Sequence, residues 1–222
     1  MDKNALKITA DGSHTLYVEE LDETYHSVHG AIQEAKHVFI NAGLNYTHKD
    51  AVNILEVGFG TGLNAFLTLL DSQETNRDIH YTGVEAFPLQ EELLNDLNYL
   101  KELKAKEKEV KLFHLLHQCN WNSYQFIMDN FRLKKVQTDL NNFIADEQFH
   151  IIYFDAFGPR VQPELWDKSI FEKMYKALNE RGVLVTYCAK GSVKRTLKEV
   201  GFEIESLPGP PGKREMTRAV KC

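Results

Sequence analysis

The feature that most constrains the fold is a compact apolar strand that runs directly into a glycine-rich turn and then into a helix. The strand is Val52-Asn53-Ile54-Leu55-Glu56-Val57, and the turn is Gly58-Phe59-Gly60-Thr61-Gly62. Glycines let the backbone turn tightly and let a ligand lie against bare main chain. A helix N-terminus also offers free N–H groups to an anionic ligand. The pattern is therefore typical of α/β folds that bind a cofactor at the end of their first strand.

Strands and helices alternate along the rest of the chain, which predicts a mostly parallel sheet. The expected strands after the first are Ile79–Val84, Phe131–Gln137, Ile151–Phe154, Val183–Tyr187, Phe202–Leu207 and Thr217–Val220. Helices are expected over residues 30–42 and 63–70, after Pro88, after Pro163 and over Gly191–Val200. Only a loop separates the last two strands, so they should pair as an antiparallel hairpin. The predicted fold class is α/β, a doubly wound Rossmann-like sheet with a reversed last strand.

Length and composition place the chain among ordinary globular proteins. Its 222 residues suit one α/β domain, predicted over residues 51–222, with residues 1–50 as an N-terminal extension packed on the core. No apolar run approaches the ~20 residues that span a bilayer, and no signal-peptide core is visible. The three cysteines are scattered, and the nine histidines form no metal-ligand pattern. We therefore expect a cytoplasmic protein with no membrane contact and no metal.

The glycine-rich turn favours S-adenosylmethionine over a dinucleotide. A dinucleotide fingerprint would place Gly or Ala six positions along, where this chain has Leu63. The G-x-G-x-G form, with the acidic Glu56 two residues before it, suits a ligand that presents an amino-acid end. A nucleotide-binding oxidoreductase remains an alternative, and so does a turn that only packs a helix on a strand.

Acidic residues close three of the predicted strands. Glu85 could accept hydrogen bonds from both hydroxyls of an adenosine ribose, and Asp139 from the adenine amino group. Asp155 lies at the strand edge where α/β folds bind ligands, and a carboxylate there could take the proton of an amine that is to be methylated. Each also has a simpler interpretation, as a solvated strand end or a turn cap.

Basic residues gather toward the C-terminus. Residues 181–222 carry nine Lys or Arg against four Asp or Glu, although the whole chain has a net charge of −6. Arg160, Lys190, Lys213 and Arg214 are candidates for contact with RNA phosphates. The alternative is a solvated surface that happens to be basic.

Taken together, these motifs resemble the methyltransferase domain of the wobble-uridine tRNA modification protein MnmC. The matching segments are residues 14–40, Glu56–Asn64, Glu85–Leu89, Phe154–Phe157, Pro163–Trp166 and Gly212–Met216. The chain departs from the family at Asp155-Ala156-Phe157-Gly158-Pro159, where the family has Asp-Gly-Phe-Ala-Pro. The stretch from about His114 to Lys135 is longer than expected, which blurs the placement of Asp139.

The resemblance implies methyl transfer from S-adenosylmethionine to the 5-aminomethyl nitrogen of uridine 34 in tRNA. It implies a catalytic Asp155, with Phe157 beside the target base. In two-domain members of the family a flavin oxidase domain follows, whereas this chain ends at Cys222, so we expect it to bind no flavin and other enzymes to make the amine. It also implies the full set of donor-binding residues, which comprises Glu56, Gly58, Phe59, Gly60, Thr61, Gly62, Asn64, Glu85, Phe87, Asp139, Leu140 and Asp155. The alternatives are a methyltransferase for a small molecule or a protein, and a non-catalytic RNA-binding module.

Overall fold

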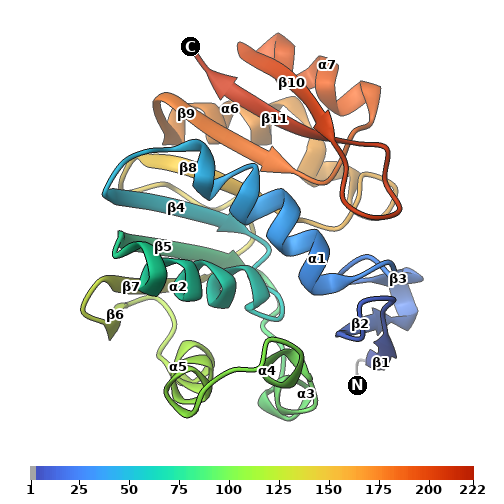
Figure 1. The fold of residues 1–222 in the computed structure, drawn as a ribbon. Coiled ribbons are helices and arrows are strands. Elements are labelled where there is room, and N and C mark those ends of the chain that lie inside the picture. Colours follow the sequence, from blue (N-terminus) through green and yellow to red (C-terminus); the bar gives the residue numbers. More distant parts are fainter. Residues whose placement is uncertain (1–3) are drawn as a thin grey trace.

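The computed structural model describes residues 4–222, which form an eight-stranded sheet with helices on both faces (Figure 1). A second, three-stranded sheet lies at the N-terminus and comprises β1 (Asn4–Ile8), β2 (His14–Val18) and β3 (Glu23–Thr24). The large sheet has the order β10-β11-β9-β8-β4-β5-β7-β6. Its strands are β4 (Ala51–Val57), β5 (Asp78–Glu85), β6 (Tyr124–Met128), β7 (Phe131–Gln137), β8 (Phe149–Phe154), β9 (Leu178–Thr186), β10 (Phe202–Pro208) and β11 (Glu215–Lys221).

Five neighbouring strands, β7, β5, β4, β8 and β9, run parallel, and the last strand is reversed as predicted. The reversed β11 lies between β9 and β10 rather than at the edge, because α7 carries the chain outward before the hairpin returns. At the opposite edge, β6 and β7 form an antiparallel hairpin around Asp129-Asn130. After β4 the chain builds outward through β5 to β6 and β7 on one side, and it then crosses to β8 on the other side of β4. The carboxyl ends of β4 and β8 therefore meet at the topological switch point, where such sheets bind ligands.

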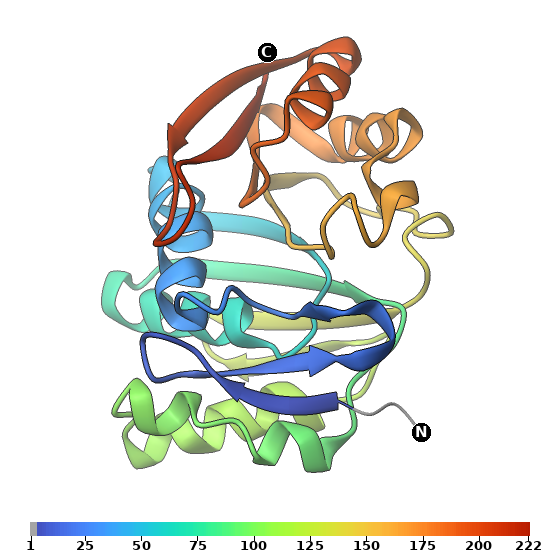
Figure 2. The ribbon, with the colours of Figure 1, turned by 90° about the vertical axis from the view of Figure 1, so that its right-hand side faces the viewer.

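Helices cover each face of the large sheet, as the two views in Figures 1 and 2 show. One face carries α1 (Ala31–Ala35), its π-helical continuation Lys36–Asn41, α2 (Leu63–Thr75) and α5 (Glu107–Gln118). The other face carries α6 (Lys168–Ala177) and α7 (Gly191–Val200). Two short helices, α3 (Glu91–Asn95) and α4 (Tyr99–Glu102), lie on the path between β5 and α5.

The N-terminal segment shares the core of the large sheet. Leu16, Val38, Phe39 and Leu44 are at most 1% exposed and belong to the same apolar cluster as Ile54 of β4. Apolar burial of this kind contributes about 1.5–3 kcal/mol for each large side chain. The segment is therefore held against α2 and the sheet edge, next to the end of β4.

Several elements differ from the sequence expectations. The helix expected at Pro88 begins at Glu91, and the strand expected from Val183 begins at Leu178, where the β8–β9 pairing shifts register. The helices α4 and α5 were not predicted at all, and only the end of α5 falls within the longer stretch noted from about His114. By contrast, α7 occupies the predicted residues and ends at Gly201, which adopts the left-handed conformation with φ 116°.

Candidate functional site

The glycine-rich turn joins β4 to α2 through three residues with positive φ. Gly58, Gly60 and Gly62 have φ values of 86°, 48° and 69°. A Cβ on Gly58 would lie 2.9 Å from the Asp155 carbonyl oxygen, and one on Gly62 would lie 2.7 Å from the His117 ring. Both positions therefore require glycine for conformation and for space.

The other two residues of the turn point into the protein. Phe59 is 4% exposed and packs edge-on against the rings of His117 and Trp121. Thr61 is 2% exposed and accepts a hydrogen bond from the Tyr99 hydroxyl at 3.3 Å. These contacts hold both side chains inside the protein, so the turn presents its backbone to a ligand.

Glu85, at the end of β5, is bound to the same turn. The Gly60 N–H donates to its Oε2 at 3.0 Å, and the Phe87 N–H donates to its Oε1 at 2.9 Å. Burial raises the pKa of this carboxyl, whereas the hydrogen bonds from Phe87 and Gly60 lower it. The Phe87 side chain is itself 77% exposed. The Glu85 carboxylate is therefore fixed beside the glycine turn, and its role in binding the ribose stays a prediction.

Asn64 connects two carboxylates at the centre of the site. Its Nδ2 donates to Glu56 Oε1 at 2.9 Å and to Asp155 Oδ2 at 2.8 Å. Burial raises the pKa of Glu56 and of Asp155 well above the usual range, and the hydrogen bond from Asn64 opposes this rise in both. The structure therefore brings the donor-side Glu56 and the predicted catalytic Asp155 together, which their separation in the sequence does not show.

These residues fit the amino-acid end of S-adenosylmethionine. Within the described part of the chain, Asn64 Oδ1 is a buried acceptor without a hydrogen-bond partner, and it lies beside two carboxyl groups. A cationic group with several N–H donors would satisfy such a set of acceptors. The bare backbone of the glycine turn provides the adjoining cradle, since a Cβ at Gly58 or Gly62 would collide with its surroundings.

The segment after β8 is held from several sides. The Tyr187 hydroxyl donates to the Ala156 carbonyl at 2.9 Å, and Trp166 Nε1 donates to the Phe157 carbonyl at 2.8 Å. The Phe157 ring meets the Tyr25 ring edge-on, with 5.0 Å between centroids. A Cβ on Gly60 would lie 3.1 Å from the Tyr25 ring. Tyr25 therefore bridges the donor turn and the predicted base-binding residue.

The predicted RNA-binding cations fall into two groups. Lys190 and Arg214 are exposed. By contrast, Arg160 donates to Glu23 Oε2 at 3.1 Å, and Lys213 Nζ donates to Glu34 Oε2 at 2.5 Å. Lys213 also lies 3.9 Å from the centre of the Tyr187 ring. Arg160 and Lys213 thus tie the N-terminal segment to the acceptor side of the site.

The remaining predicted donor-binding residues lie after β7. Asp139 is exposed, and its Oδ1 accepts the Asn141 N–H at 2.7 Å, whereas Leu140 is buried in the core beneath α6. Both residues lie at the carboxyl edge of the parallel strands, because β7 is parallel to β5. It does not join them to Asn64, Glu56 and Asp155.

Sequence reasoning missed Tyr25, Glu34 and Tyr187. Tyr187 directly follows a strand that ends at the ligand-binding edge, so the same rule that selected Asp155 could have found it. Tyr25 and Glu34 carry no such local signal, because only the packing of the N-terminal segment brings them to the site.

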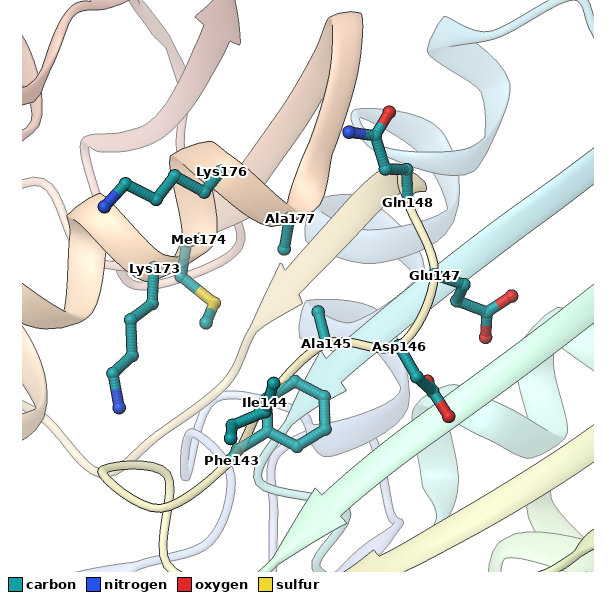
Figure 3. Close-up of a pocket in the computed structure, with 10 residues that line it drawn as sticks. All are labelled: Phe143, Ile144, Ala145, Asp146, Glu147, Gln148, Lys173, Met174, Lys176 and Ala177. Atoms are coloured by element: carbon teal, nitrogen blue, oxygen red, sulfur yellow. The ribbon is translucent and has the colours of Figure 1, made fainter.

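A cavity of about 450 Å³ lies elsewhere on the molecule (Figure 3). Lys173 and Lys176 of α6 line one side of it, and Asp146 and Glu147, in the loop before β8, line another. None of the residues singled out in the sequence lines this cavity.

Within residues 4–222, no helix combines the length and the apolar character needed to cross a membrane. Over the same range, no group of His, Cys, Asp or Glu residues could hold a metal ion.

Comparison with known proteins shows the family of this chain. Residues 101–222 match the family described as S-adenosyl-L-methionine-dependent methyltransferase. The tRNA 5-methylaminomethyl-2-thiouridine biosynthesis bifunctional protein MnmC of Leptospira interrogans is 32% identical over 210 residues, covering 89% of this chain and 32% of that protein. The protein of the same name from Idiomarina loihiensis is 29% identical, covering 88% of this chain and 35% of that protein. The chain therefore spans about a third of the length of these relatives.

Two solved structures share the fold. MNMC2 from Aquifex aeolicus has a TM-score of 0.79 at 24% sequence identity, covering 99% of this chain and 70% of that one. Spermidine synthase from Thermotoga maritima has a TM-score of 0.55 at 13% identity, covering 98% of this chain and 71% of that one. These likenesses confirm the predicted fold class, and the sequence identity to the two MnmC proteins confirms the resemblance to that family. The family match extends over more than half of the chain, and this protein accordingly belongs to the S-adenosyl-L-methionine-dependent methyltransferases.

Proposed function

We propose that this methyltransferase acts on the 5-aminomethyl nitrogen of wobble uridine 34 in tRNA and forms 5-methylaminomethyl(2-thio)uridine. The observation that carries the proposal is the position of the Asp155 carboxylate, which shares the Asn64 amide with Glu56 at the glycine turn. A proton acceptor is thereby held beside the residues that fit the methyl donor. The relatives from Leptospira and Idiomarina support the choice of substrate, because their name refers to tRNA 5-methylaminomethyl-2-thiouridine biosynthesis.

The donor would be held by residues of the glycine turn and of the neighbouring strand ends. S-adenosylmethionine supplies, when bound, an electrophilic methyl group on a sulfonium sulfur. Glu56 and Asn64 offer acceptors to its ammonium group, and Glu85 offers one to the ribose hydroxyls. Asp139 and Leu140 at the end of β7 are proposed to border the adenine, as the sequence resemblance implies.

Asp155 acts on the acceptor amine. An alkyl amine is mostly protonated at neutral pH and then has no free lone pair with which to attack. Burial raises the pKa of Asp155, which makes its carboxylate a stronger base than a solvated aspartate. The carboxylate can therefore remove the ammonium proton and orient the nitrogen toward the donor. Phe157, braced by Tyr25, offers an aromatic edge on which the uracil ring could rest.

The RNA would meet exposed cations around this edge of the sheet. We propose Lys190 and Arg214 as phosphate contacts, since both side chains are exposed. Arg160 and Lys213 were predicted in the same role, but each is engaged in an ion pair with the N-terminal segment.

We also propose that residues 1–50 act as an extension of the methyltransferase domain, which spans residues 51–222. The cytoplasmic location expected from the sequence stays a prediction.

Nucleoside mass analysis tests the proposal directly. Undermodified tRNA that carries 5-aminomethyluridine would be incubated with the protein and methyl-labelled S-adenosylmethionine. The expected result is label in a wobble nucleoside that is one methyl group heavier than the starting one. Free 5-aminomethyluridine and small alkyl amines serve as parallel substrates. Label in those amines, with none in the tRNA, would instead identify a small-molecule methyltransferase.

A further inference from the structure

Asn64 lies in the first turn of α2, two residues beyond the last glycine of the turn, and its side chain is 2% exposed. One nitrogen, Nδ2, donates to both Glu56 Oε1 and Asp155 Oδ2. The two carboxylate oxygens can therefore be no farther apart than the sum of these two hydrogen-bond lengths. Glu56 belongs to the donor side of the site and Asp155 to the acceptor side.

Two carboxylates at this separation repel each other, and the burial of Glu56 strengthens the repulsion because little water screens it. The Asp155 charge contributes to the raised pKa of Glu56, whereas Glu34 is the neighbouring charge that raises the pKa of Asp155. The Asn64 amide opposes this effect by giving one N–H to each group. Without the amide, one of the two carboxyls would keep a proton up to a higher pH.

We propose that Asn64 is a positioning residue that couples the two halves of the site, so that a cation bound at Glu56 favours a cation bound at Asp155. The coupling rests on the proposed function, because it takes the acceptor to be an amine. An ammonium group that donates to Asn64 Oδ1, which has no partner among the described residues, polarises the amide and strengthens the N–H bond that Nδ2 gives to Asp155. That bond favours the ionised carboxylate, to which an amine cation binds, so donor and acceptor bind better together than separately.

A purely structural role is the alternative, and Thr68 provides the matched control. Thr68 lies one turn further along α2, is fully buried, and donates from Oγ1 to the Asn64 carbonyl oxygen at 2.7 Å. The substitution Thr68→Val removes a buried hydrogen bond of the same helix and leaves the Asn64 amide in place. General loosening of α2 should appear in both variants, whereas loss of coupling should appear only in Asn64→Ala.

The first measurement is the affinity for S-adenosylhomocysteine with and without undermodified tRNA. In wild type and Thr68→Val, tRNA should tighten binding by about 5–150-fold, the usual range of site coupling. In Asn64→Ala, this factor should fall toward one. Asn64→Asp, which keeps the volume but replaces the donor by an acceptor, should also lose the coupling and provides the test if the alanine variant does not fold.

The second measurement is the pH dependence of turnover. Asp155 is surrounded by Glu56 on β4, Glu34 on α1, Lys213 in the β10–β11 loop and Tyr187 after β9. None of these groups changes in Asn64→Ala, so the acidic limb should move to higher pH through loss of the amide alone. The rate at neutral pH should fall about 10–100-fold, the effect of removing one hydrogen bond to a charged group.

Two results would overturn the inference. One is a tRNA-dependent tightening in Asn64→Ala equal to that in Thr68→Val, and the other is an unshifted acidic limb. Failure of the proposed function has a different signature, because wild-type protein would then transfer no methyl group to tRNA. In that case, the number of protons released on binding S-adenosylhomocysteine would still report on Asn64, since it should differ between Asn64→Ala and Thr68→Val.

Discussion

A methyl group added at Gly58 should disable the donor site through a collision that can be located in advance. Gly58 has φ 86°, and a Cβ there would lie 2.9 Å from the Asp155 carbonyl oxygen and 3.3 Å from its carbonyl carbon. Both contacts are with backbone at the end of β8, which is tied to β4 by the Asp155 N–H bond to Val57 O at 3.0 Å. The strand ends must therefore separate before alanine fits.

The expected cost has two parts. The left-handed backbone costs about 1–2 kcal/mol for a residue with a Cβ, and overpacking adds about 1–3 kcal/mol. The total of about 2–5 kcal/mol corresponds to a fall in Tm of roughly 4–20 °C for a chain of this size. The displaced turn should also weaken binding of S-adenosylhomocysteine by more than about tenfold, since Asp155 and the turn move apart.

Gly201→Ala is the control that isolates backbone strain. Gly201 has φ 116°, but its added Cβ would meet only the Tyr175 ring, at an ordinary 3.5 Å. Its substitution should cost about 1–2 kcal/mol and leave binding of S-adenosylhomocysteine unchanged. Thermal denaturation and calorimetry on both variants would measure the two effects. If Gly58→Ala bound S-adenosylhomocysteine as tightly as Gly201→Ala does, the steric argument for the turn would be wrong.

Three further predictions concern other parts of the site. Asp155→Asn should lower the rate of methyl transfer by about 10²–10⁴-fold, as single-turnover kinetics at saturating S-adenosylmethionine would measure. The pKa of Asp155 is higher in the folded protein, so its contribution to stability is lost as pH rises. Asp155→Asn should therefore gain Tm over wild type at about pH 8 and less at about pH 5, and a pH-independent difference would contradict this sign. Glu85→Ala should weaken S-adenosylhomocysteine binding by about 10–100-fold, because two backbone N–H groups lose their acceptor along with the ribose, and unchanged affinity would remove Glu85 from the donor site. Lys190→Ala and Arg214→Ala should each weaken tRNA binding and lower the slope of log affinity against log salt concentration by about one. An unchanged slope would place the RNA elsewhere on the protein.

The central part of the fold was predictable because parallel strands place their carboxyl ends at one edge. The turn after β4, Glu85 after β5 and Asp155 after β8 all follow apolar runs that are easy to recognise. Once those runs are accepted as parallel strands, their final residues must be neighbours. The roles of these residues remain predictions, although their proximity is now established for Glu56, Asn64 and Asp155.

The helices before β7 escaped prediction for a different reason. Four of the first five residues of α5 are charged, and its buried face consists only of Leu112, Phe113 and Leu116. Such a narrow apolar stripe resembles a polar connection when it is read without its neighbours. Packing against α2 stabilises α5, through contacts such as that between the Phe66 and Phe113 rings, whose centroids are 5.0 Å apart.

Residues supplied by the N-terminal segment could not be found from local pattern at all. Tyr25 reaches Gly60 and Phe157, and Glu34 reaches Lys213, across separations of 35 to 179 positions in the sequence. No periodicity encodes such pairs, because they arise only after α1 has packed against α2. The segment therefore contributes to the site as a consequence of the core that it shares with the sheet.

Glu56 is buried and Asp155 is half-buried, and the energetics of these two acids argue that the site serves binding rather than stability. A carboxylate taken out of water loses solvation that the single hydrogen bond it receives from Asn64 only partly replaces. Glu56 and Asp155 both have raised pKa values, so the folded protein would be more stable at neutral pH with neutral groups in their place. Such an arrangement is expected where a cationic ligand supplies the missing compensation. Both the sulfonium donor and an amine acceptor are cations, and the two acids joined by Asn64 lie where the glycine turn meets the end of β8.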